Sequence, residues 1–393
     1  MTIAKKIDTT MSRQSWIRKM FEEGAKLKEK HGPENVFDFS LGNPNLAPPE
    51  EFHTVLKEIV NSSEHGVHGY MPNAGYPEVR EAVAKYVSEE QRVNLSAADV
   101  IMTCGAAGAL NVTFKTILDP GDVVITPSPY FVEYNAYVDN HGGILKTAPT
   151  NPDFTLNIDN IADAIDEKTK AILINSPNNP TGQIYLEDSL RQLGSLLESK
   201  GKELGRTLYL IADEPYRNIV YDGVKIPSIF SVYKDTILAT SYSKNISIPG
   251  ERIGFIAVNS QAEHREDLLN GMTLANRILG FVNAPALIQR VIARIQGITV
   301  DTAEYLEKRD MLCEGLAECG YEFTKPPGAF YLFPKTPVPD DVEFIKALQK
   351  QRILAVPGSG FGGPGHFRIA FCVDNKTIVN SMPGFKKAID SYK

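Results

Sequence analysis

A lysine flanked by hydroxyl side chains and followed by an arginine carries the strongest chemical signal in the sequence. Ser241, Ser243, Lys244 and Arg252 lie between two apolar segments that have the composition of buried strands. An ammonium group at the mouth of an apolar sheet loses hydration, which lowers its pKa, and such a lysine can add to carbonyl compounds to form imines. Hydroxyl groups and a guanidinium also suit a phosphate group. Taken alone, the same pattern fits an exposed loop lysine beside a capping serine.

A carboxylate follows another apolar segment. Residues 208–211 are apolar and Asp213 comes directly after Ala212, which predicts that its side chain lies at the carboxyl edge of a sheet and is partly desolvated. A buried carboxylate requires a cationic partner. A protonated pyridine nitrogen is such a partner, and keeping that nitrogen protonated makes the ring an electron sink. The alternative is that Asp213 caps the N-terminus of a helix after the strand.

Two turns of unusual composition also follow predicted strands. Residues 103–108, with Gly105, Ala106 and Ala107 at their centre, precede a predicted helix over 109–118, and backbone N–H groups at a helix N-terminus can bind an anion. Asn179 lies in residues 175–182, where two Asn and Pro turns hold side-chain amides at the sheet edge. By contrast, the literal Gly-x-Gly-x-x-Gly sequence at 358–363 is followed by Pro364 and a short strand, so we expect no dinucleotide site there.

These residues need a framework that brings several strand ends together. Between about residues 98 and 260, short apolar segments alternate with segments of helical periodicity. This predicts an α/β domain of three layers, α/β/α, with a mainly parallel sheet, in which ligands bind beyond the carboxyl ends of the strands. The expected strands are residues 99–103, 122–126, 170–174, 208–212, 236–240 and 253–258.

The two ends of the chain have a different pattern of predicted helices and strands. An amphipathic helix near residues 15–30 and a turn at 41–46 come first. After about residue 280, we expect helices over 301–319 and 342–351 and strand-like segments at 328–333 and 367–372. This predicts a small α+β domain. We therefore expect a large domain over residues 46–280 and a small domain formed by residues 1–45 and 281–393.

The composition argues against several classes of function. The 393 residues include 41 Lys plus Arg and 48 Asp plus Glu, a net charge of −7, and the basic residues are scattered, so we expect no nucleic-acid partner. No segment approaches the roughly 20 apolar residues of a bilayer helix, and the first residues do not form a signal peptide. Four cysteines without a Cys-x-x-Cys pair predict reduced thiols in a cytoplasm and no zinc site. We expect neither a membrane partner nor any metal site.

Taken together, the motifs resemble those of fold-type I pyridoxal-phosphate enzymes of the class I/II aminotransferase group. They cover nearly the whole chain, at residues 69–80, 105–107, 127–130, 178–182, 213–216, 241–252, 327–331 and 367–370. The resemblance implies the cofactor pyridoxal 5′-phosphate and an aminotransferase that moves an amino group from an L-amino acid to a 2-oxo acid, with an aspartate-type enzyme as one form of this reaction. Several relatives have a larger residue after the phosphate-loop glycine, where this chain has Ala106 and Ala107. The resemblance therefore does not determine which substrate side chain the pocket accepts.

The resemblance also implies roles for single residues toward the cofactor. Lys244 would hold it as a Schiff base and move the substrate proton, Asp213 would pair with the pyridine nitrogen, and Tyr130 would stack on the ring. Asn179 and Tyr216 would donate to the phenolate oxygen. The implied phosphate site comprises Gly105, Ala106, Ala107, Ser241, Ser243 and Arg252.

For the substrate, the resemblance implies that Arg368 clamps the α-carboxylate, helped by Asn179 and the backbone near Gly42. On a strand, Arg368 should point away from the apolar Phe367, and an internal salt bridge is the alternative for it. Tyr70 would enter from a second subunit, which predicts a homodimer with shared active sites.

Two other functions use the same framework. A C–S or β-lyase, or an eliminating synthase, would keep the cofactor and break a different bond. A cofactor-sensing regulator would be non-catalytic and would need a DNA-binding domain, for which the roughly 45 residues before the core are too few and too weakly basic.

Overall fold

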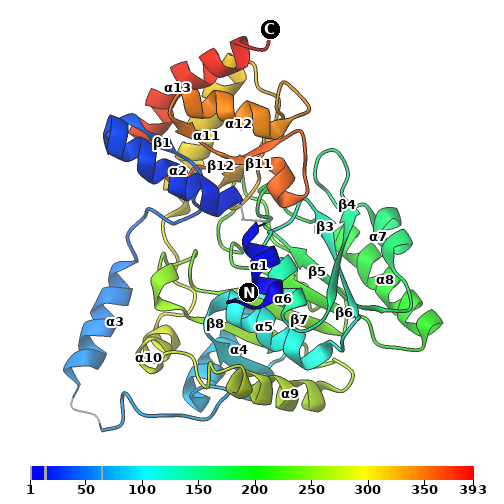
Figure 1. Cartoon of the computed structure of the whole chain (residues 1–393). Helices are drawn as coiled ribbons and strands as arrows, with labels where there is room; N and C mark the ends of the chain where they lie inside the picture. Colours follow the sequence, from blue (N-terminus) through cyan, green and yellow to red (C-terminus); the bar gives the residue numbers. More distant parts are fainter. Residues whose placement is uncertain (1, 13–15, 63–64) are drawn as a thin grey trace.

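The computed structural model describes residues 2–12, 16–62 and 65–393. Ser15, where the first amphipathic helix was expected to begin, lies outside the described residues; the helix itself, α2, spans Trp16–His31. Among the described helices, none is long and apolar enough to cross a bilayer. The described residues form a large α/β body and a smaller body above it in Figure 1.

A mainly parallel sheet forms the centre of the large body, as predicted. Its strand order is β2-β8-β7-β6-β5-β3-β4, and only β8 runs antiparallel to its two neighbours. Each expected strand is present to within two residues at either end. The strands are β2 (Val100–Thr103), β3 (Val123–Ser128), β4 (Ile144–Pro149), β5 (Thr169–Asn175), β6 (Tyr209–Asp213), β7 (Thr236–Ser241) and β8 (Gly254–Val258).

The edge strand β4 was not expected from the sequence. Central strands such as β6 and β8 are buried along their whole length, whereas β4 is mostly exposed or half-buried, and Ile144 is 53% exposed. Because an edge strand covered on fewer sides needs no continuous apolar segment, its sequence lacks the signal that identified the others.

Helices cover both faces of the sheet because successive strand residues point to opposite sides. Ile172 and Leu210 belong to the core on one face, and Leu173 and Ile211 belong to the core on the other. The first face is covered by α4 (Pro77–Gln91), α7 (Ile158–Ala164), α8 (Glu187–Leu204) and α10 (Ala286–Arg294), and α3 (Glu50–Asn61) packs against α10 at the margin of this core. The second is covered by α5 (Gly105–Ile117), α6 (Tyr134–Asp139) and α9 (Arg265–Ile278).

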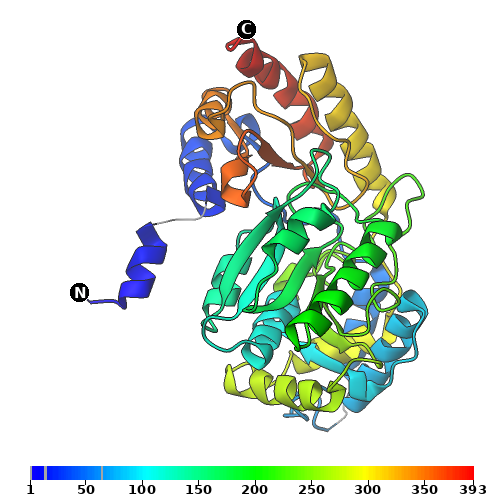
Figure 2. The same ribbon diagram turned by 90° about the vertical axis from the view of Figure 1, so that its right-hand side faces the viewer.

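The small α+β body combines segments from both ends of the chain. Figure 1 shows the N-terminal α2 beside the C-terminal elements, and Figure 2 shows α11 and α13 packed side by side. Asp301 caps α11 by accepting a hydrogen bond from the Ala303 amide. The elements are β1 (Phe37–Asp38), β9 (Tyr331–Leu332), β10 (Ile353–Leu354), β11 (Val356–Pro357), β12 (Phe367–Ala370), α11 (Thr302–Cys319), α12 (Asp341–Lys350) and α13 (Asn375–Asp390).

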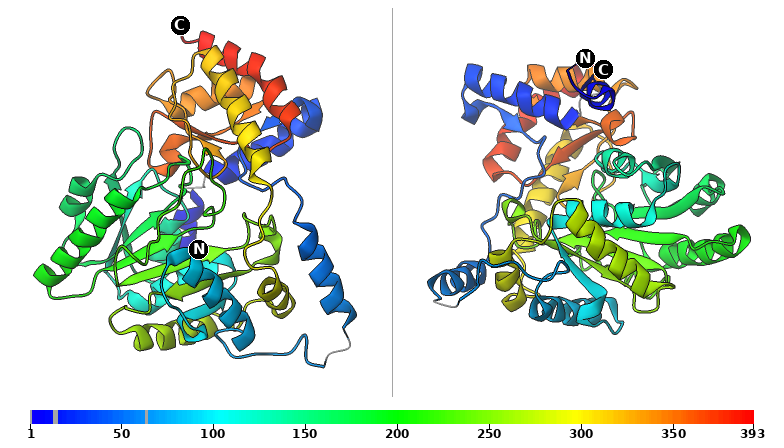
Figure 3. Two further views of the ribbon diagram at one scale, coloured as in Figure 1. Left: turned by 180° about the vertical axis from the view of Figure 1, so that it is seen from behind. Right: turned by 60° about the horizontal axis from the view of Figure 1, so that its bottom comes forward.

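Helix α10 packs as part of the large body. This helix packs against α3 and α4, and Ile288 and Ile292 belong to the large-body core, whereas Val300 belongs to the small-body core. Figure 3 shows α3 standing at the edge of the molecule. The boundary predicted at residue 280 is a prediction of the sequence. From the packing of α10 and Val300 we propose a boundary between residues 295 and 300 in its place.

The remaining elements are α1 and four short 3-10 helices. Helix α1 (Lys5–Ser12) stands apart in Figure 2, and Lys6 Nζ forms an ion pair with Asp139 at 2.8 Å. The 3-10 helices are η1 (Pro33–Asn35), η2 (Ala97–Asp99), η3 (Pro249–Glu251) and η4 (Gly358–Phe361). The Gly-x-Gly-x-x-Gly sequence therefore forms η4 and precedes β12 instead of opening an α-helix, as expected.

Candidate active site

A cavity of about 320 Å³ lies at the carboxyl ends of β5, β6 and β7, between the two bodies. These strands are parallel neighbours, and Asn175 is paired in register with Asp213, so their last residues meet at one edge. Most residues predicted for the site line this cavity. They are Gly42, Ala106, Ala107, Asn179, Asp213, Tyr216, Ser241, Ser243, Lys244, Arg252 and Arg368.

Three predicted residues, Gly105, Tyr70 and Tyr130, are not among the described residues that line the cavity. Gly105 is the first residue of α5 and has a φ of 71°, and a Cβ there would lie 3.1 Å from Arg252 Nη2. A glycine therefore lets the guanidinium approach the helix N-terminus. Tyr70 is 93% exposed in the segment between α3 and α4 and is not among the described residues that line this chain's cavity.

The aromatic wall differs from the expectation. Tyr130 is not among the described residues that line the cavity, and its hydroxyl accepts a hydrogen bond from Asn135 Nδ2 at 2.9 Å. The next residue, Phe131, lines the cavity instead, together with Tyr137. In a turn, neighbouring side chains point in different directions, so a one-residue choice between aromatic residues cannot be made from the motif.

Lys244 is a cavity residue and not an exposed loop lysine. Its Nζ donates to the Gly42 carbonyl at 2.7 Å and lies 5.6 Å from the centre of the Phe330 ring. Burial lowers its pKa to about 8, and the positive charges of Arg368 and Arg252 act in the same direction. A sizeable fraction of its amine is therefore neutral near physiological pH.

Asp213 has one satisfied and one unsatisfied carboxylate oxygen. The Tyr134 hydroxyl donates to Oδ2 at 2.5 Å, whereas Oδ1 is buried and has no hydrogen-bond partner in the described part of the chain. Burial raises the pKa of Asp213 to about 7, against the opposing effect of Tyr134. The residues after β6 form a turn, so the alternative of a helix cap is wrong. An unpaired oxygen of this kind suits a protonated ring nitrogen.

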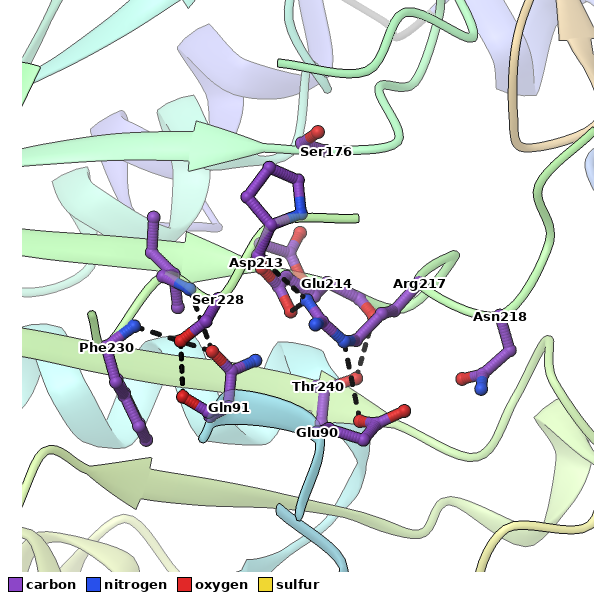
Figure 4. Close-up of polar contacts among 12 residues, drawn as sticks. Glu90, Gln91, Ser176, Asp213, Glu214, Arg217, Asn218, Ser228, Phe230 and Thr240 are labelled. Carbon is purple, nitrogen blue, oxygen red and sulfur yellow. Dashed lines mark hydrogen bonds and ion pairs between the residues drawn. The ribbon is translucent and has the colours of Figure 1, made fainter. Parts of the chain in front are cut away.

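A partly buried ion network holds the turn after β6. Figure 4 shows Arg217 between Glu214 and Glu90, with N–O distances of 2.9 Å and 3.4 Å. Thr240 Oγ1 donates to the Glu214 carbonyl at 2.9 Å, which joins the turn to β7. Burial raises the pKa of Glu214, and Arg217 opposes this effect. The network fixes the backbone on which Asp213 and Tyr216 are mounted.

Arg368 reaches the cavity from the small body. Its Nη1 donates to Asn179 Oδ1 at 3.0 Å and its Nη2 to the Ser40 carbonyl at 2.6 Å. The guanidinium lies over the rings of Tyr331 and Phe361, at 4.8 Å and 4.7 Å from their centres. Its Nε is buried without a hydrogen-bond partner, and no carboxylate of the described residues pairs with Arg368. The alternative of an internal salt bridge is therefore wrong.

The strand alternation around Arg368 is as predicted. Phe367 packs on the opposite side, against Tyr321 and Phe344 in the core of the small body. Burial lowers the pKa of Arg368. A buried cation that makes only neutral contacts is poised for an anion.

Basic side chains outnumber carboxylates in the cavity. Ala106 and Ala107 lie in the first turn of α5, and Ser241 and Ser243 lie at the end of β7 with Arg252 nearby. Of the described residues that line the cavity, three have basic side chains, Lys244, Arg252 and Arg368, and one, Asp213, has a carboxylate. This excess suits a phosphate at one end and a carboxylate at the other.

Sequence reasoning missed several wall residues. The Tyr331 and Tyr216 hydroxyls share a hydrogen bond at 2.8 Å, so Tyr331 extends the polar side of the cavity. Asn175 Oδ1 accepts from the Asn179 amide at 2.7 Å and fixes its loop. The other missed residues are Leu110, Phe131, Tyr137, Pro215 and Pro249. Asn175, Pro215, Pro249 and Tyr331 lie in the quoted motifs and could have been found there, whereas Leu110, Phe131 and Tyr137 carry no local signal.

Known proteins are similar to this chain in sequence and fold along nearly its whole length. The family model for aminotransferase class I and II matches residues 34–381. A probable aspartate/prephenate aminotransferase from Aquifex aeolicus is 31% identical, over 93% of this chain and 94% of that protein. The crystal structure of an aminotransferase from Eubacterium rectale has 40% identity and a TM-score of 0.97, with all of both chains covered. A mutant of Thermus thermophilus aspartate aminotransferase has 26% identity and a TM-score of 0.88, with 99% and 100% covered.

Proposed function

Because the chain belongs to the class I and II aminotransferase family, whose members depend on pyridoxal phosphate, it is an aminotransferase, and we propose that aspartate is one of its amino donors and a 2-oxo acid its acceptor. The names of several relatives support aspartate, including the enzymes from Thermotoga maritima and Bacillus subtilis. One observation carries the proposal, namely that Lys244, the open oxygen of Asp213, Arg252 and Arg368 share one cavity.

The residues of the cavity fit pyridoxal 5′-phosphate. When bound, this cofactor supplies a carbonyl carbon that bonds to amino groups and a ring that withdraws electrons from the α-carbon of the substrate. Asp213 Oδ1 would meet the ring nitrogen, Phe131 would take the place predicted for Tyr130 against the ring, and Tyr216 and Asn179 would meet its oxygen. The phosphate would be held by Ala106, Ala107, Ser241, Ser243 and Arg252. Gly105 would begin the helical turn that carries Ala106 and Ala107.

The chain's own residues then divide the work on the substrate. Lys244 can hold the cofactor and move a proton at Nζ, because a lysine with a lowered pKa exchanges protons near neutral pH. Arg368 and Asn179 would bind the α-carboxylate and orient the substrate, and the backbone of Gly42 would close the same end. A plain amine cannot satisfy Arg368, so the site selects amino acids.

A second carboxylate on the substrate requires a further cation. Of the cations that line the cavity in the described residues, Lys244 and Arg252 are committed to the cofactor and Arg368 to the α-carboxylate. We therefore propose that a homodimer is the active unit and that the partner subunit contributes to the substrate side-chain pocket. Its Tyr70 would reach the phosphate, in keeping with the exposure of this residue in one chain. The four free cysteines support a reducing compartment, the cytoplasm.

The test combines a substrate panel with chemical labelling. The purified protein is incubated with amino donors and 2-oxoglutarate, oxaloacetate or pyruvate, and the product amino acids are measured. Release of ammonia and pyruvate from a single amino acid would instead indicate a lyase. Borohydride reduction and peptide mapping should label Lys244, and Lys244→Ala should lose transamination. Lys234→Ala, at an exposed lysine, is the matched control. A label on another lysine would contradict the assignment.

A further inference from the structure

The Asp213 carboxylate is held asymmetrically, and the residue responsible is not among those that contact the cavity. Oδ2 accepts the Tyr134 hydroxyl, while Oδ1 has no partner among the described residues. We propose that Tyr134 is a positioning residue for the aminotransferase reaction, whose hydroxyl fixes Asp213 so that Oδ1 meets the ring nitrogen of the cofactor. This inference rests on the proposed function, in which Asp213 pairs with that nitrogen.

Tyr134 is itself rigidly placed. It is fully buried at the start of α6, and its backbone amide donates to the Phe131 carbonyl at 3.1 Å. The two rings pack edge to face, with centres 5.5 Å apart and an interplanar angle of 87°. Because Phe131 lines the cavity, the aromatic wall and the support of Asp213 belong to one short segment. Moving the Tyr134 ring away from Oδ2 would therefore disturb that wall.

The other contacts of Asp213 leave only its Oδ1 available to a ligand. Its backbone carbonyl accepts a hydrogen bond from Asn175 Nδ2 at 2.8 Å, which fixes the residue at the end of β6. With the backbone and Oδ2 both engaged, rotation of the carboxylate would break the hydrogen bond to Tyr134. Oδ1 is therefore the oxygen available to a ligand in the cavity, and a buried acceptor without a partner favours binding a donor.

The pKa shifts of Tyr134 and Asp213 also favour a hydrogen bond from the Tyr134 hydroxyl to an ionised Asp213. Burial raises the pKa of Tyr134 far above that of free tyrosine, and the charge on Asp213 adds to this, so the proton stays on the hydroxyl. The hydrogen bond in turn opposes the effect of burial on Asp213 and stabilises its ionised form. An ionised Asp213 is the state that attracts a protonated ring nitrogen.

The test separates positioning from general support of the fold. Apoproteins are titrated with pyridoxal 5′-phosphate and with 1-deazapyridoxal 5′-phosphate, in which a carbon replaces the ring nitrogen. Tyr134→Phe keeps the ring and removes the hydroxyl. We expect it to weaken cofactor binding about tenfold, the scale of a charge-assisted hydrogen bond, and to change binding of the analogue less than about twofold.

Two controls accompany this measurement. Tyr209→Phe removes the hydroxyl of a buried tyrosine in the same core, at the opposite end of β6 from Asp213, and should leave both affinities unchanged. In an Asp213→Asn background, Tyr134→Phe should have no further effect on cofactor affinity, since the two residues act as a unit.

Equal losses for both ligands in Tyr134→Phe would overturn the proposal, because the hydroxyl would then support only the shape of the site. Additive losses in the double variant would do the same. If instead the wild-type protein did not bind the cofactor, or Asp213→Asn bound it normally, the proposed function would be wrong in its assignment of Asp213, whatever Tyr134 did.

Discussion

Arg368 and Asn179 join the small body to the large one inside the cavity. The hydrogen bond from Arg368 Nη1 to Asn179 Oδ1, at 3.0 Å, connects β12 to the loop that follows β5. Both residues are buried, and the remaining contacts of the guanidinium are a backbone carbonyl and two aromatic rings. The arginine is thus oriented before any carboxylate arrives, which reduces the entropy lost on binding.

Arg368→Lys should weaken substrate use and spare the cofactor. Lysine keeps the charge but loses the planar fork and its contacts over the rings of Tyr331 and Phe361. Loss of a bound charge-assisted pair is worth on the order of 2 to 5 kcal/mol, so kcat/KM for α-amino acids should fall by about two orders of magnitude or more. The visible spectrum of the bound cofactor should be retained. Arg191→Lys, on the exposed face of α8, is the matched control; a normal kcat/KM in Arg368→Lys would place the carboxylate site elsewhere.

Gly42→Ala should act on the same end of the cavity by steric displacement. A Cβ at this position would overlap the Tyr331 hydroxyl, which is hydrogen-bonded to Tyr216, so the tyrosine or the Gly42 loop must move. A displacement of about 1 Å in a positioned site can cost on the order of 100-fold in rate, and we expect kcat/KM to fall on that scale. Gly250→Ala, where an added Cβ meets nothing, should have no effect. Steady-state kinetics with both variants decide the matter, and unchanged kinetics in Gly42→Ala would exclude this backbone from the site.

The lowered pKa of Lys244 predicts a pH profile. Below about pH 8 its amine is mostly protonated and cannot attack a carbonyl, and above it the amine is mostly neutral. The initial rate of cofactor addition to the apoprotein should therefore rise through a midpoint near pH 8 and then level off. Removing a neighbouring positive charge by Arg368→Gln should move that midpoint to higher pH. Stopped-flow absorbance measures both, and a midpoint near 10.5 would mean that burial does not tune this lysine.

A shared active site predicts complementation between two inactive proteins. Lys244→Ala lacks the reactive amine, and replacement of Tyr70 by Ala should remove the contact made in the partner's phosphate site. A hybrid of the two has one site with both residues intact, so mixing them should restore part of the activity. Each variant alone, carried through the same mixing, is the control. No recovery after subunit exchange has been verified by native mass spectrometry would argue that each chain forms its own site.

The sequence by itself determined the central sheet and the residues at its edge. Strands such as β6 are buried on both faces, so each needs a continuous apolar segment, and that segment and the polar residue that ends it are visible together. Parallel pairing then brings Asp213, Asn179 and Lys244 to one edge whatever the details of the loops. This is why the main residues of the cavity could be named before the fold was known.

The tertiary structure alone decided which neighbours complete that edge. The choice of Phe131 over Tyr130, the bond from Tyr134 to Asp213 and the approach of Tyr331 to Tyr216 all depend on side-chain directions in turns and on contacts between distant segments. The packing of α10 against α3 and α4 is of the same kind. Such contacts leave no periodic pattern in a single sequence, because apolar and aromatic residues of similar size satisfy several partners equally well until the elements are packed together.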